Sequence, residues 1–435
     1  MTDTDRAPVS IVMVAIGGYG YWYLKTLLEE FPAGSVELRA AVDPFPERSV
    51  LVPLLQERGI PIFPDLESAF AAGVSAELAV IASPIHHHVP QSVQALQAGC
   101  HVLCDKPLGT TVQEGLALIG ERDAARRWVR IGYQWSYSRA VQALKRDILD
   151  GRWGAPRHAA AFCLWPRGSD YYTRNDWAGR IRDDEGRWVL DSPLNNAMAH
   201  FLHNLLYLLG PTLAESTRPV GVIAECGRAA SIENYDSVAC RVELAGEVEL
   251  LFFASHAVER EIGPCFRILF EEGEVFLGES GEGSTGSPAD EEVGLAAGSA
   301  LPAWAAGPGI VGIDRRGRRV IYGHPDADHQ FRKLFEAVEA VRSEVPLSCG
   351  PEAALAQTVC MNGVQESVPE PPPVPEALVR RAGAPELCWV EGLATAYREG
   401  YRQGRLPSQL GHAWSVPGRP VDLRDYREFP SRGRG

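Results

Sequence analysis

A glycine-rich turn between an apolar run and a helix-like pattern constrains the fold of this chain more than any other stretch. Residues 10–16 are mostly apolar and β-branched, a cluster of three glycines follows, and residues 21–28 have helical spacing. This order predicts a strand, a tight turn and a helix. Against the G-x-G-x-x-G fingerprint, Gly17 and Gly20 fill the second and third positions, while Ala15 stands at the first. Glycines allow a pyrophosphate to approach the backbone at the start of a helix, although such a turn can also serve packing alone.

The next predicted strand favours the nucleotide interpretation of this turn. Residues 36–42 are mostly apolar and end at Asp43, 23 residues after Gly20, close to where a Rossmann unit carries its ribose-binding acid. A carboxylate accepts hydrogen bonds from a ribose diol and repels a 2′-phosphate, so NAD is expected rather than NADP. The alternative is that Asp43 only opens the turn before Pro44.

The length, charge and cysteine content of the chain limit its class. Its 435 residues exceed one typical domain, so two domains with appendages are expected. The formal charge of −14 argues against nucleic acid or an anionic membrane as a partner, because phosphate binding needs clustered lysine and arginine. Nine cysteines without a C-x-x-C pair favour reduced thiols, and no apolar run approaches membrane-spanning length. We therefore expect a soluble cytoplasmic protein with a small-molecule partner.

Strands and helices alternate through the first third of the chain. Apolar runs at residues 78–82 and 101–104 are each followed by polar residues, and helical patterns separate them. This alternation predicts a doubly wound parallel sheet, whose ligands lie at the carboxyl ends of the strands. The glycine turn, Asp43, residues 83–88 and residues 105–107 all fall at those ends. The three consecutive histidines within 83–88 point in different directions, so no metal site is expected there.

Three of these motifs together resemble the Gfo/Idh/MocA oxidoreductases, named after glucose-fructose oxidoreductase and inositol dehydrogenase. They are residues 15–20, residues 83–88 and residues 98–108, where Asp105-Lys106-Pro107 stands in place of the family's E-K-P with a shorter acid. The resemblance covers roughly residues 9–365. It implies that Lys106 lies beside the nicotinamide and the reacting carbon. The residues expected at the cofactor are Gly17, Gly18, Tyr19, Gly20, Asp43, Ser83, Pro84, His88, Asp105 and Lys106.

A second group of polar residues lies in the stretch 190–210. Asn196, His200 and His203 are spaced i, i+4 and i+7, which places them on one stripe of one predicted helix. The family pattern that this stretch resembles is D-x-x-x-H-x-x-D, so His200 takes the position of the active-site histidine and the other two stand where acids are usual. Without that pattern, a histidine on a leucine-rich helix is more often a core residue. A zinc site on the two histidines would need a third ligand that the sequence does not supply.

The segment 171–180 mixes aromatic side chains with hydrogen-bond donors. Tyr172, Arg174 and Trp177 suit a sugar ring, whose C–H face packs on an aromatic ring while its hydroxyls take polar partners. A surface loop held together by its aromatic residues is an equally good interpretation. The residues expected at the substrate are Tyr172, Arg174, Trp177, Asn196 and His203.

The pattern changes after about residue 150, where alternating segments predict antiparallel strands. We expect an N-terminal Rossmann domain at 1–135 and a C-terminal α+β domain at 136–365 for substrate binding and oligomerisation, built on an open, mostly antiparallel sheet. A flexible insert is expected at 279–309. Residues 366–435 would be a proline-rich spacer and a tail with one helix, marked by Leu387 to Tyr401. Family members often form dimers or tetramers through the outer face of this sheet, so a homodimer or homotetramer is expected.

The resemblance and the motifs favour an NAD(P)-dependent dehydrogenase acting on a secondary hydroxyl of a sugar, a sugar derivative or a cyclitol. His200 would be the base, because the ordinary histidine pKa lies near working pH, and Lys106 would polarise the oxygen and relay the proton. Two alternatives stay open. A redox-assisted lyase or glycosidase would use the same residues without net NADH formation. A non-catalytic NAD-binding scaffold or sensor would explain why four residues depart from the pattern, namely Ala15, Asp105, Asn196 and His203.

Overall fold

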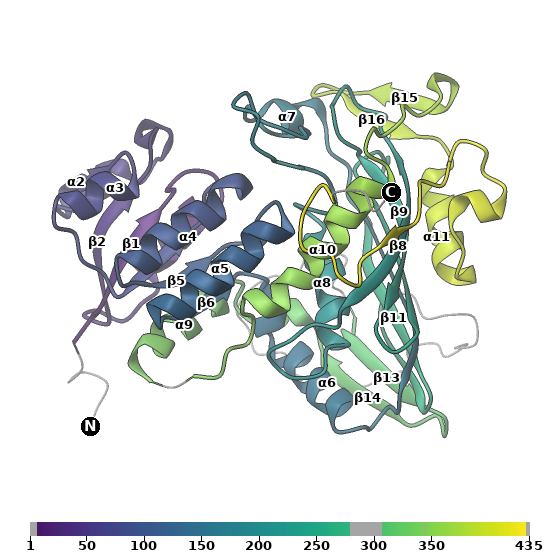
Figure 1. Ribbon diagram of the computed structural model, residues 1–435, viewed down its shortest axis with the longest axis horizontal. Coiled ribbons are helices and arrows are strands. Elements are labelled where there is room, and N and C mark those ends of the chain that lie inside the picture. The colour runs from purple at the N-terminus through teal and green to yellow at the C-terminus, as the bar shows by residue number, and fades with distance from the viewer. Residues whose placement is uncertain (1–6, 279–306, 344, 432–435) are drawn as a thin grey trace. The chain divides into compact units, whose positions relative to one another are not determined.

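The computed structural model describes residues 7–278, 307–343 and 345–431, which divide into two compact units (Figure 1). Unit 1 comprises the described residues within 1–137, 330–358 and 427–435, and unit 2 comprises those within 138–329 and 359–426. Residues 330–358 therefore belong to the N-terminal unit, although the sequence pattern placed them with the second domain. The insert expected at 279–309 lies outside the described residues except for its last three.

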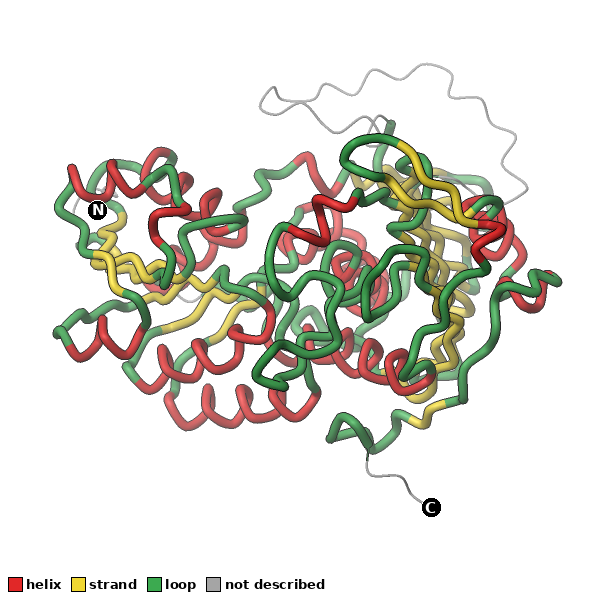
Figure 2. The backbone as a smooth tube through the Cα atoms, turned by 90° about the horizontal axis from the view of Figure 1, so that it is seen from above, coloured by secondary structure: helices red, strands yellow, loops and turns green. Residues whose placement is uncertain are grey.

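Unit 1 is built on a six-stranded parallel sheet in the order β3-β2-β1-β4-β5-β6. The strands are β1 (Val9–Val14), β2 (Val36–Val42), β3 (Ile62–Phe63), β4 (Leu78–Ile81), β5 (His101–Cys104) and β6 (Val129–Ile131). Its helices are α1 (Gly20–Glu29), α2 (Val52–Glu57), α3 (Leu66–Ala71), α4 (His88–Gln97), α5 (Val112–Ala125) and α9 (Arg332–Arg342). Helices lie on both faces of the strands (Figure 2). The expected doubly wound fold is confirmed, and the strand order reverses between β1 and β4.

Helix α9 completes the core of unit 1, although it lies far from the other elements in sequence. Phe331, Leu334, Ala337 and Val338 are buried and pack in one cluster with the apolar residues of β1, β4 and α1. This packing stabilises the helix, whose apolar residues recur at helical spacing. It also brings Lys333 into the interior of the unit, with a fully buried side chain.

Unit 2 contains a nine-stranded mixed sheet in the order β14-β13-β12-β11-β7-β10-β9-β8-β17. Only β7 and β10 pair in parallel, and the other neighbours are antiparallel. The strands are β7 (Pro156–Leu164), β8 (Pro219–Gly227), β9 (Ser237–Leu244), β10 (Val248–Ser255), β11 (Ile262–Phe270), β12 (Gly273–Leu277), β13 (Ile310–Asp314), β14 (Arg319–Gly323) and β17 (Val421–Asp422). The helices are α6 (Arg139–Leu149), α7 (Ser169–Thr173), α8 (Ala199–Leu208) and α11 (Leu393–Gln403), while α10 (Pro351–Ser367) begins in unit 1 and ends in unit 2. The mostly antiparallel sheet agrees with the expectation.

The C-terminal segment up to Tyr426 is an integral part of unit 2. Phe162 and Phe253 on one face of the sheet pack against Tyr397 and Tyr401 of α11, and α6 and α8 lie on the opposite side (Figure 1). Residues 387–401, expected as one helix, form the strand β16 (Leu387–Val390) and then α11. Strand β16 pairs with β15 (Val379–Ala382) because its alternating residues bury Cys388 and Val390.

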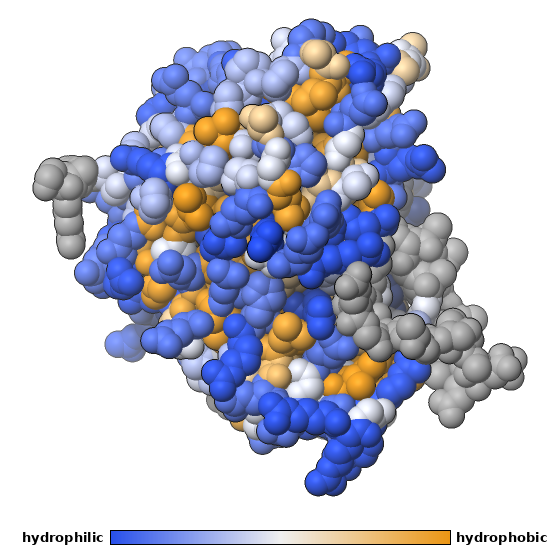
Figure 3. Space-filling view, turned by 90° about the vertical axis from the view of Figure 1, so that its right-hand side faces the viewer, coloured by the Kyte–Doolittle hydropathy of each residue, from blue (hydrophilic) through white to orange (hydrophobic). Residues whose placement is uncertain are grey.

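The face of unit 2 that carries α11 is mostly hydrophilic, with apolar residues in scattered groups (Figure 3). The proline-rich stretch that precedes β15 is not a free spacer, because the Pro371 and Pro372 carbonyl groups accept hydrogen bonds from Arg228. Among the described residues, no helix is long and apolar enough to cross a membrane.

Candidate active site

The glycine-rich turn between β1 and α1 requires glycine at one position and leaves space at two others. A Cβ atom on Gly20 would lie 2.0 Å from the Ala15 carbonyl oxygen, so no side chain fits there. Nothing lies within 4 Å of the Cβ position at Gly17 or Gly18. Ala15 adopts a left-handed φ of 64°, which is the conformation that glycine at the first fingerprint position allows without strain. The open backbone at Gly17 and Gly18 fits the approach of a pyrophosphate.

Asp43 holds the glycine turn against the end of β2. Its Oδ2 atom accepts a hydrogen bond from the backbone N–H of Ile16 at 2.9 Å, and Oδ1 accepts one from Phe45 at 2.8 Å. Each carboxylate oxygen retains a lone pair that could accept a ribose hydroxyl. Asp43 therefore combines a structural contact with the geometry expected of a ribose-binding acid.

His88 bridges two of the loops at the carboxyl edge of the sheet. Its imidazole is 1% exposed, with Nδ1 2.7 Å from the Pro107 carbonyl oxygen and Nε2 2.8 Å from the Ser83 carbonyl oxygen. Burial lowers the pKa of His88, and the two carbonyl groups and Asp105 only partly oppose this effect. The sequence placed His88 at the cofactor. In the structure a carbonyl oxygen lies at each ring nitrogen, and the neutral imidazole donates a hydrogen bond to one of the two, so His88 connects the segments after β4 and β5.

The Asp105 carboxylate, which the sequence placed at the cofactor, also has protein groups as its partners. Its Oδ1 atom accepts hydrogen bonds from Lys333 Nζ and from the Tyr23 hydroxyl, both at 2.8 Å. Lys333 Nζ also donates to the Gly132 carbonyl at 3.0 Å, and a Cβ atom on Gly132 would lie 2.9 Å from the carboxylate. The Asp105 carboxylate is thus enclosed by protein groups and anchors the residue directly before Lys106.

The charges around Asp105 decide its ionisation. Burial alone would raise the pKa of this carboxyl, but the positive charges of Lys333 and Lys106 outweigh burial and lower it. The Lys333 ammonium also lies 5.3 Å from the centre of the Tyr19 ring and 4.8 Å from that of Tyr23. Lys333 therefore forms a buried ion pair with Asp105 and lies against the Tyr19 ring of the glycine turn.

In unit 2, Asn196 precedes helix α8 instead of lying on it. The helix begins at Ala199, so Asn196 and His200 do not form the expected stripe along one helix. The side-chain amide of Asn196 donates to Asp191 Oδ1 at 2.8 Å and to the Tyr171 hydroxyl at 3.4 Å. The other Asp191 oxygen accepts from the Gly179 N–H at 2.6 Å. Asp191 thus supplies a buried carboxylate five residues before Asn196, which the sequence pattern did not identify.

The two histidines of α8 have different environments. His200 lies in the first turn of the helix and is half-buried, with its ring centre 6.3 Å from that of Phe201. His203 is 1% exposed and stacks on Tyr207, with ring centres 5.7 Å apart. Burial and then the charge of Lys145 lower the pKa of His203 to about 3. This environment is that of a neutral core residue, in contrast to the substrate contact expected for His203.

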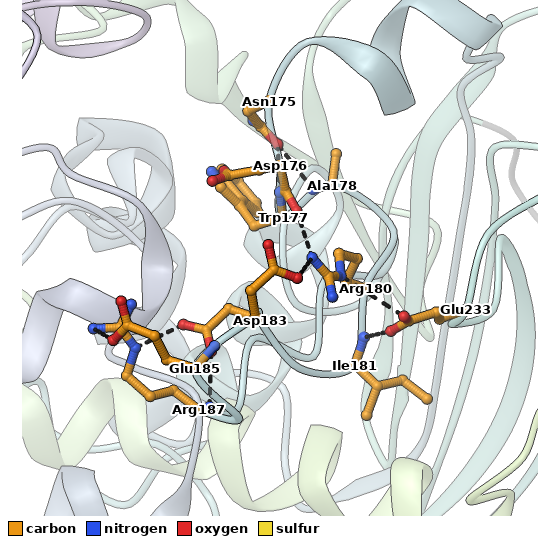
Figure 4. A network of polar contacts seen from close by, with 11 residues as sticks. Asn175, Asp176, Trp177, Ala178, Arg180, Ile181, Asp183, Glu185, Arg187 and Glu233 are labelled. Atoms are coloured by element: carbon orange, nitrogen blue, oxygen red, sulfur yellow. Dashed lines mark hydrogen bonds and ion pairs between the residues drawn. The ribbon is translucent and has the colours of Figure 1, made fainter.

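The segment around α7 contains the aromatic and basic residues expected at the substrate. The Tyr172 ring packs edge-on against Tyr171 at 5.2 Å. The Arg174 guanidinium lies 3.5 Å from the centre of the Tyr171 ring and 5.4 Å from that of Trp177. Farther along, ion pairs fix the loop, with Arg180 joined to Glu233 and Arg187 to Asp183 (Figure 4). The loop is therefore ordered by its own contacts.

The structure assembles the expected cofactor residues of unit 1 at one edge of the sheet, whereas His200 and the expected substrate residues belong to unit 2. Sequence reasoning missed Lys333, Tyr23 and Asp191. The alternation of helices and strands carries no signal for Lys333, because α9 enters unit 1 from the C-terminal half of the chain. The described residues contain no group of three histidine, cysteine, aspartate or glutamate side chains that could hold a metal ion.

Comparisons with known proteins agree with this geometry. Residues 9–133 match the sequence model described as "Oxidoreductase family, NAD-binding Rossmann fold". The chain is 26% identical over 199 residues to inositol 2-dehydrogenase of Rubrobacter xylanophilus, covering 44% of this chain and 54% of that protein. It is 26% identical over 176 residues to D-glucoside 3-dehydrogenase of Escherichia coli, covering 38% and 46%. The chain thus spans about half the length of these curated relatives.

Solved structures are similar over most of the chain. The WlbA dehydrogenase of Bordetella pertussis, in complex with NADH and UDP-GlcNAcA, has a TM-score of 0.61 at 18% identity, covering 81% of this chain and 94% of that one. The scyllo-inositol dehydrogenase of Lactobacillus casei has a TM-score of 0.58 at 14% identity, covering 83% and 96%. At these identities, the likeness shows a shared fold for both the Rossmann sheet and the mixed sheet.

Proposed function

Because the N-terminal domain of this chain belongs to the Gfo/Idh/MocA family of oxidoreductases, we propose that the protein is an NAD-dependent dehydrogenase. Its substrate would be a secondary hydroxyl of a sugar, a sugar derivative or a cyclitol. The curated relatives include dehydrogenases of inositol and of a glucoside, which supports this substrate class. NADP would be the weaker cofactor, because the Asp43 carboxylate at the end of β2 repels a 2′-phosphate.

One observation carries the proposal. The glycine turn, Asp43, Ser83 and Lys106 all follow the carboxyl ends of neighbouring strands in one parallel sheet, at the point where the strand order reverses. The open backbone at Gly17 and Gly18 would hold the pyrophosphate, and Asp43 would hold the ribose. When bound, NAD supplies a nicotinamide ring that accepts a hydride.

Lys106 and His200 are the residues proposed for proton handling. Lys106 follows the anchored Asp105 and precedes Pro107, so its backbone is held at the ligand edge of the sheet. Its ammonium would polarise the substrate oxygen. His200, half-buried at the start of α8, would take the hydroxyl proton. Asn196, fixed by Asp191, would contact a substrate hydroxyl through its side-chain amide.

The assembly and location of the protein are further parts of the proposal. We expect a homodimer or homotetramer, which light scattering on the purified protein tests directly. Helix α11 covers the β7 and β10 part of the sheet, so association would involve α11 itself or the other strands. All nine cysteines are buried free thiols, which supports a reducing, cytoplasmic environment.

The test is NAD reduction by the purified protein with a panel of polyols and sugars, together with Lys106→Ala and His200→Ala. We expect each substitution to lower kcat by about 10²- to 10⁴-fold, which is typical of removing a positioned acid or base. NADH affinity, measured by fluorescence titration, should change little. Full turnover by both variants would contradict the assignment.

The same assay separates the alternatives. A redox-assisted lyase or glycosidase would convert its substrate without net NADH formation. Product analysis would then show conversion of the substrate while the NADH absorbance stays unchanged. A scaffold or sensor would bind NADH and leave every substrate unchanged.

A further inference from the structure

Two arginines beside Tyr171 lack the acidic partners that neutralise others in the same segment. Arg174 and Arg167 lie with their guanidinium carbons 3.5 and 5.1 Å from the centre of the Tyr171 ring. Across the described ranges 7–278, 307–343 and 345–431, neither has a carboxylate within ion-pair distance. The nearby Arg180 pairs with Asp184 at 2.7 Å. Arg187 pairs with Asp183 at 2.6 Å (Figure 4). Aspartate and glutamate outnumber lysine and arginine by 56 to 42, so the chain has no shortage of acids.

The Asp191 carboxylate, which is joined to Tyr171 through Asn196, already accepts hydrogen bonds from other groups. Asp191 accepts hydrogen bonds from the Gly179 N–H and from Asn196, which in turn donates to the Tyr171 hydroxyl. The Tyr171 hydroxyl therefore contacts the Asn196 amide, which Asp191 holds in place. The guanidinium groups of Arg167 and Arg174 lie beside the Tyr171 ring. Arg167 donates to the Pro166 carbonyl oxygen, and Arg174 donates to the Tyr171 carbonyl oxygen and forms a hydrogen bond with the Tyr171 side chain.

Two buried polar atoms in this cluster have no hydrogen-bond partner among the described residues. One is Arg167 Nε, a donor, and the other is His256 Nε2. His256 is 3% exposed, its ring centre lies 5.4 Å from that of Tyr171, and its Nδ1 atom donates to the Trp165 carbonyl at 2.8 Å. Nε2 of the neutral ring is therefore an acceptor. Buried polar atoms are rarely left without partners, so the pair indicates a ligand that carries both an acceptor and a donor.

The His256 ring carries no charge at neutral pH. Burial, the largest cause, together with the nearby charges of Arg167 and Arg174 lowers the pKa of His256 to about 3, although the hydrogen bond to Trp165 acts in the opposite direction. The ring is neutral at pH 7, so the positive charge of the cluster belongs to the two arginines alone. The backbone N–H of Arg167 also donates to the His256 carbonyl oxygen at 3.2 Å, which fixes the two residues side by side.

We propose that Arg167, Arg174 and His256 around Tyr171 form a subsite for an anionic group of the substrate. Resting on the proposed function, the inference narrows the substrate from any polyol to an acidic one. A carboxylate or a phosphoryl group would accept hydrogen bonds from the two guanidinium groups, and an adjacent hydroxyl would donate to His256 Nε2. The Tyr171 ring would support the arginines by stacking.

The experiment compares neutral probes with acidic probes of the same ring. Isothermal titration of the NADH-loaded protein would use D-glucose, D-glucuronate and D-glucose 6-phosphate, so that the two acidic probes distinguish a carboxylate from a phosphoryl group. We expect at least one acidic probe to bind about 10- to 100-fold more tightly than glucose, the range for a charge-assisted hydrogen bond. Equal or weaker binding of both acidic probes would overturn the proposal.

Substitutions locate the effect. Arg167→Gln should remove the preference for the acidic probe and leave glucose binding unchanged, and Arg167→Lys should retain part of the preference. Arg180→Gln is the matched control, because its charge is already paired and the preference should persist. If Arg167→Gln weakens acidic and neutral probes equally, the arginine has only a structural role and the subsite is refuted.

This design separates the two levels of the proposal. The dehydrogenase proposal would be refuted if the protein did not bind NADH in fluorescence titration or did not reduce NAD with any substrate. The acidic preference and its dependence on Arg167 can still be measured by titration of the protein without NADH. A dehydrogenase that turns over neutral polyols and ignores acidic ones would retain the proposed function and overturn the subsite.

Discussion

The ammonium of Lys333 lies 2.8 Å from the carboxylate of Asp105, and both side chains are buried in unit 1. The pair joins helix α9 to the residue before Lys106, although 228 positions of sequence separate them. A buried ion pair is costly to break, because the remaining charge has no water to solvate it. The pair therefore holds the segment that carries Lys106 against the glycine turn.

Removing Lys333 should destabilise the protein strongly. We expect Lys333→Met to lower the free energy of unfolding by about 3–5 kcal/mol, because Asp105 would remain buried without a counter-ion. Asp105→Asn combined with Lys333→Met should recover most of this loss, since no buried charge remains. Urea denaturation of the single and double variants measures the coupling.

Lys25→Met is a matched control for that experiment. Lys25 forms an exposed pair with Glu29 at 3.9 Å, and such pairs contribute about 0–1 kcal/mol. A Lys333→Met variant no less stable than Lys25→Met would refute the importance of the buried pair. Because the pKa of Asp105 is lowered in the folded state, its contribution is present above pH ~4 and is lost as the pH falls below that value.

Gly20→Ala should disrupt the turn, because the new Cβ atom would lie 2.0 Å from the Ala15 carbonyl oxygen. Relief requires a backbone shift, so we expect a loss of stability of about 1–3 kcal/mol and loss of NADH binding. Gly17→Ala is the control, since nothing in the protein lies within 4 Å of its Cβ position. It should fold normally, and thermal denaturation would distinguish the two variants, whereas its methyl group at the proposed pyrophosphate position should weaken NADH binding as well. Equal stability of both would contradict the steric argument.

Asp43→Asn should reduce the preference for NAD over NADP. The amide removes the charge that repels a 2′-phosphate, so we expect NADH affinity to fall about 10-fold and NADPH affinity to fall less or to rise. The amide has one acceptor oxygen, so the bond to Ile16 or the bond to Phe45 is lost at a cost of about 1 kcal/mol. Dissociation constants for both cofactors give the ratio, and Asp65→Asn, which changes a helix cap away from the strand ends, should leave it unchanged. An unchanged ratio in Asp43→Asn would exclude a ribose contact.

His203 should make stability depend on pH in mildly acidic solution. Its pKa is lowered to about 3 by burial and by Lys145, whereas an unfolded histidine titrates near pH ~6.5. The unfolded state then binds more protons, so stability falls by about 1.4 kcal/mol for each pH unit between about 6.5 and 3. His203→Phe keeps the stacking on Tyr207. It should lower the difference in bound protons between the unfolded and folded states by one, and so reduce the pH dependence of stability. Urea denaturation at pH 7.5 and 5.5 measures it, and an identical slope in the variant would contradict the prediction.

Local patterns were sufficient to predict much of unit 1. The alternation of apolar runs, glycine turns and helical spacing identified the parallel sheet, and polar residues after each strand identified its ligand edge. These features follow from short-range rules, because strand ends of one direction meet at one edge wherever the helices pack. The same rules failed at residues 387–401, where spacing compatible with a helix belongs to a strand followed by a shorter helix.

The partners of the candidate residues were decided by the tertiary structure. The sequence placed Asp105 and His88 at the cofactor by their position in motifs, but burial required partners for them, and these are Lys333, Tyr23 and two carbonyl groups. The same holds for Asn196, which lies before α8 and is fixed by Asp191.

The sequence by itself determined where chemistry-bearing residues lie along the chain and which edge of the sheet the N-terminal ones share, since periodicity and turn chemistry are local. Only the tertiary structure decided which of those side chains are enclosed by protein groups and which arginines remain without an acid among the described residues. Burial and charge pairing depend on segments such as α9 and residues 165–174, which come together through packing across long separations in sequence.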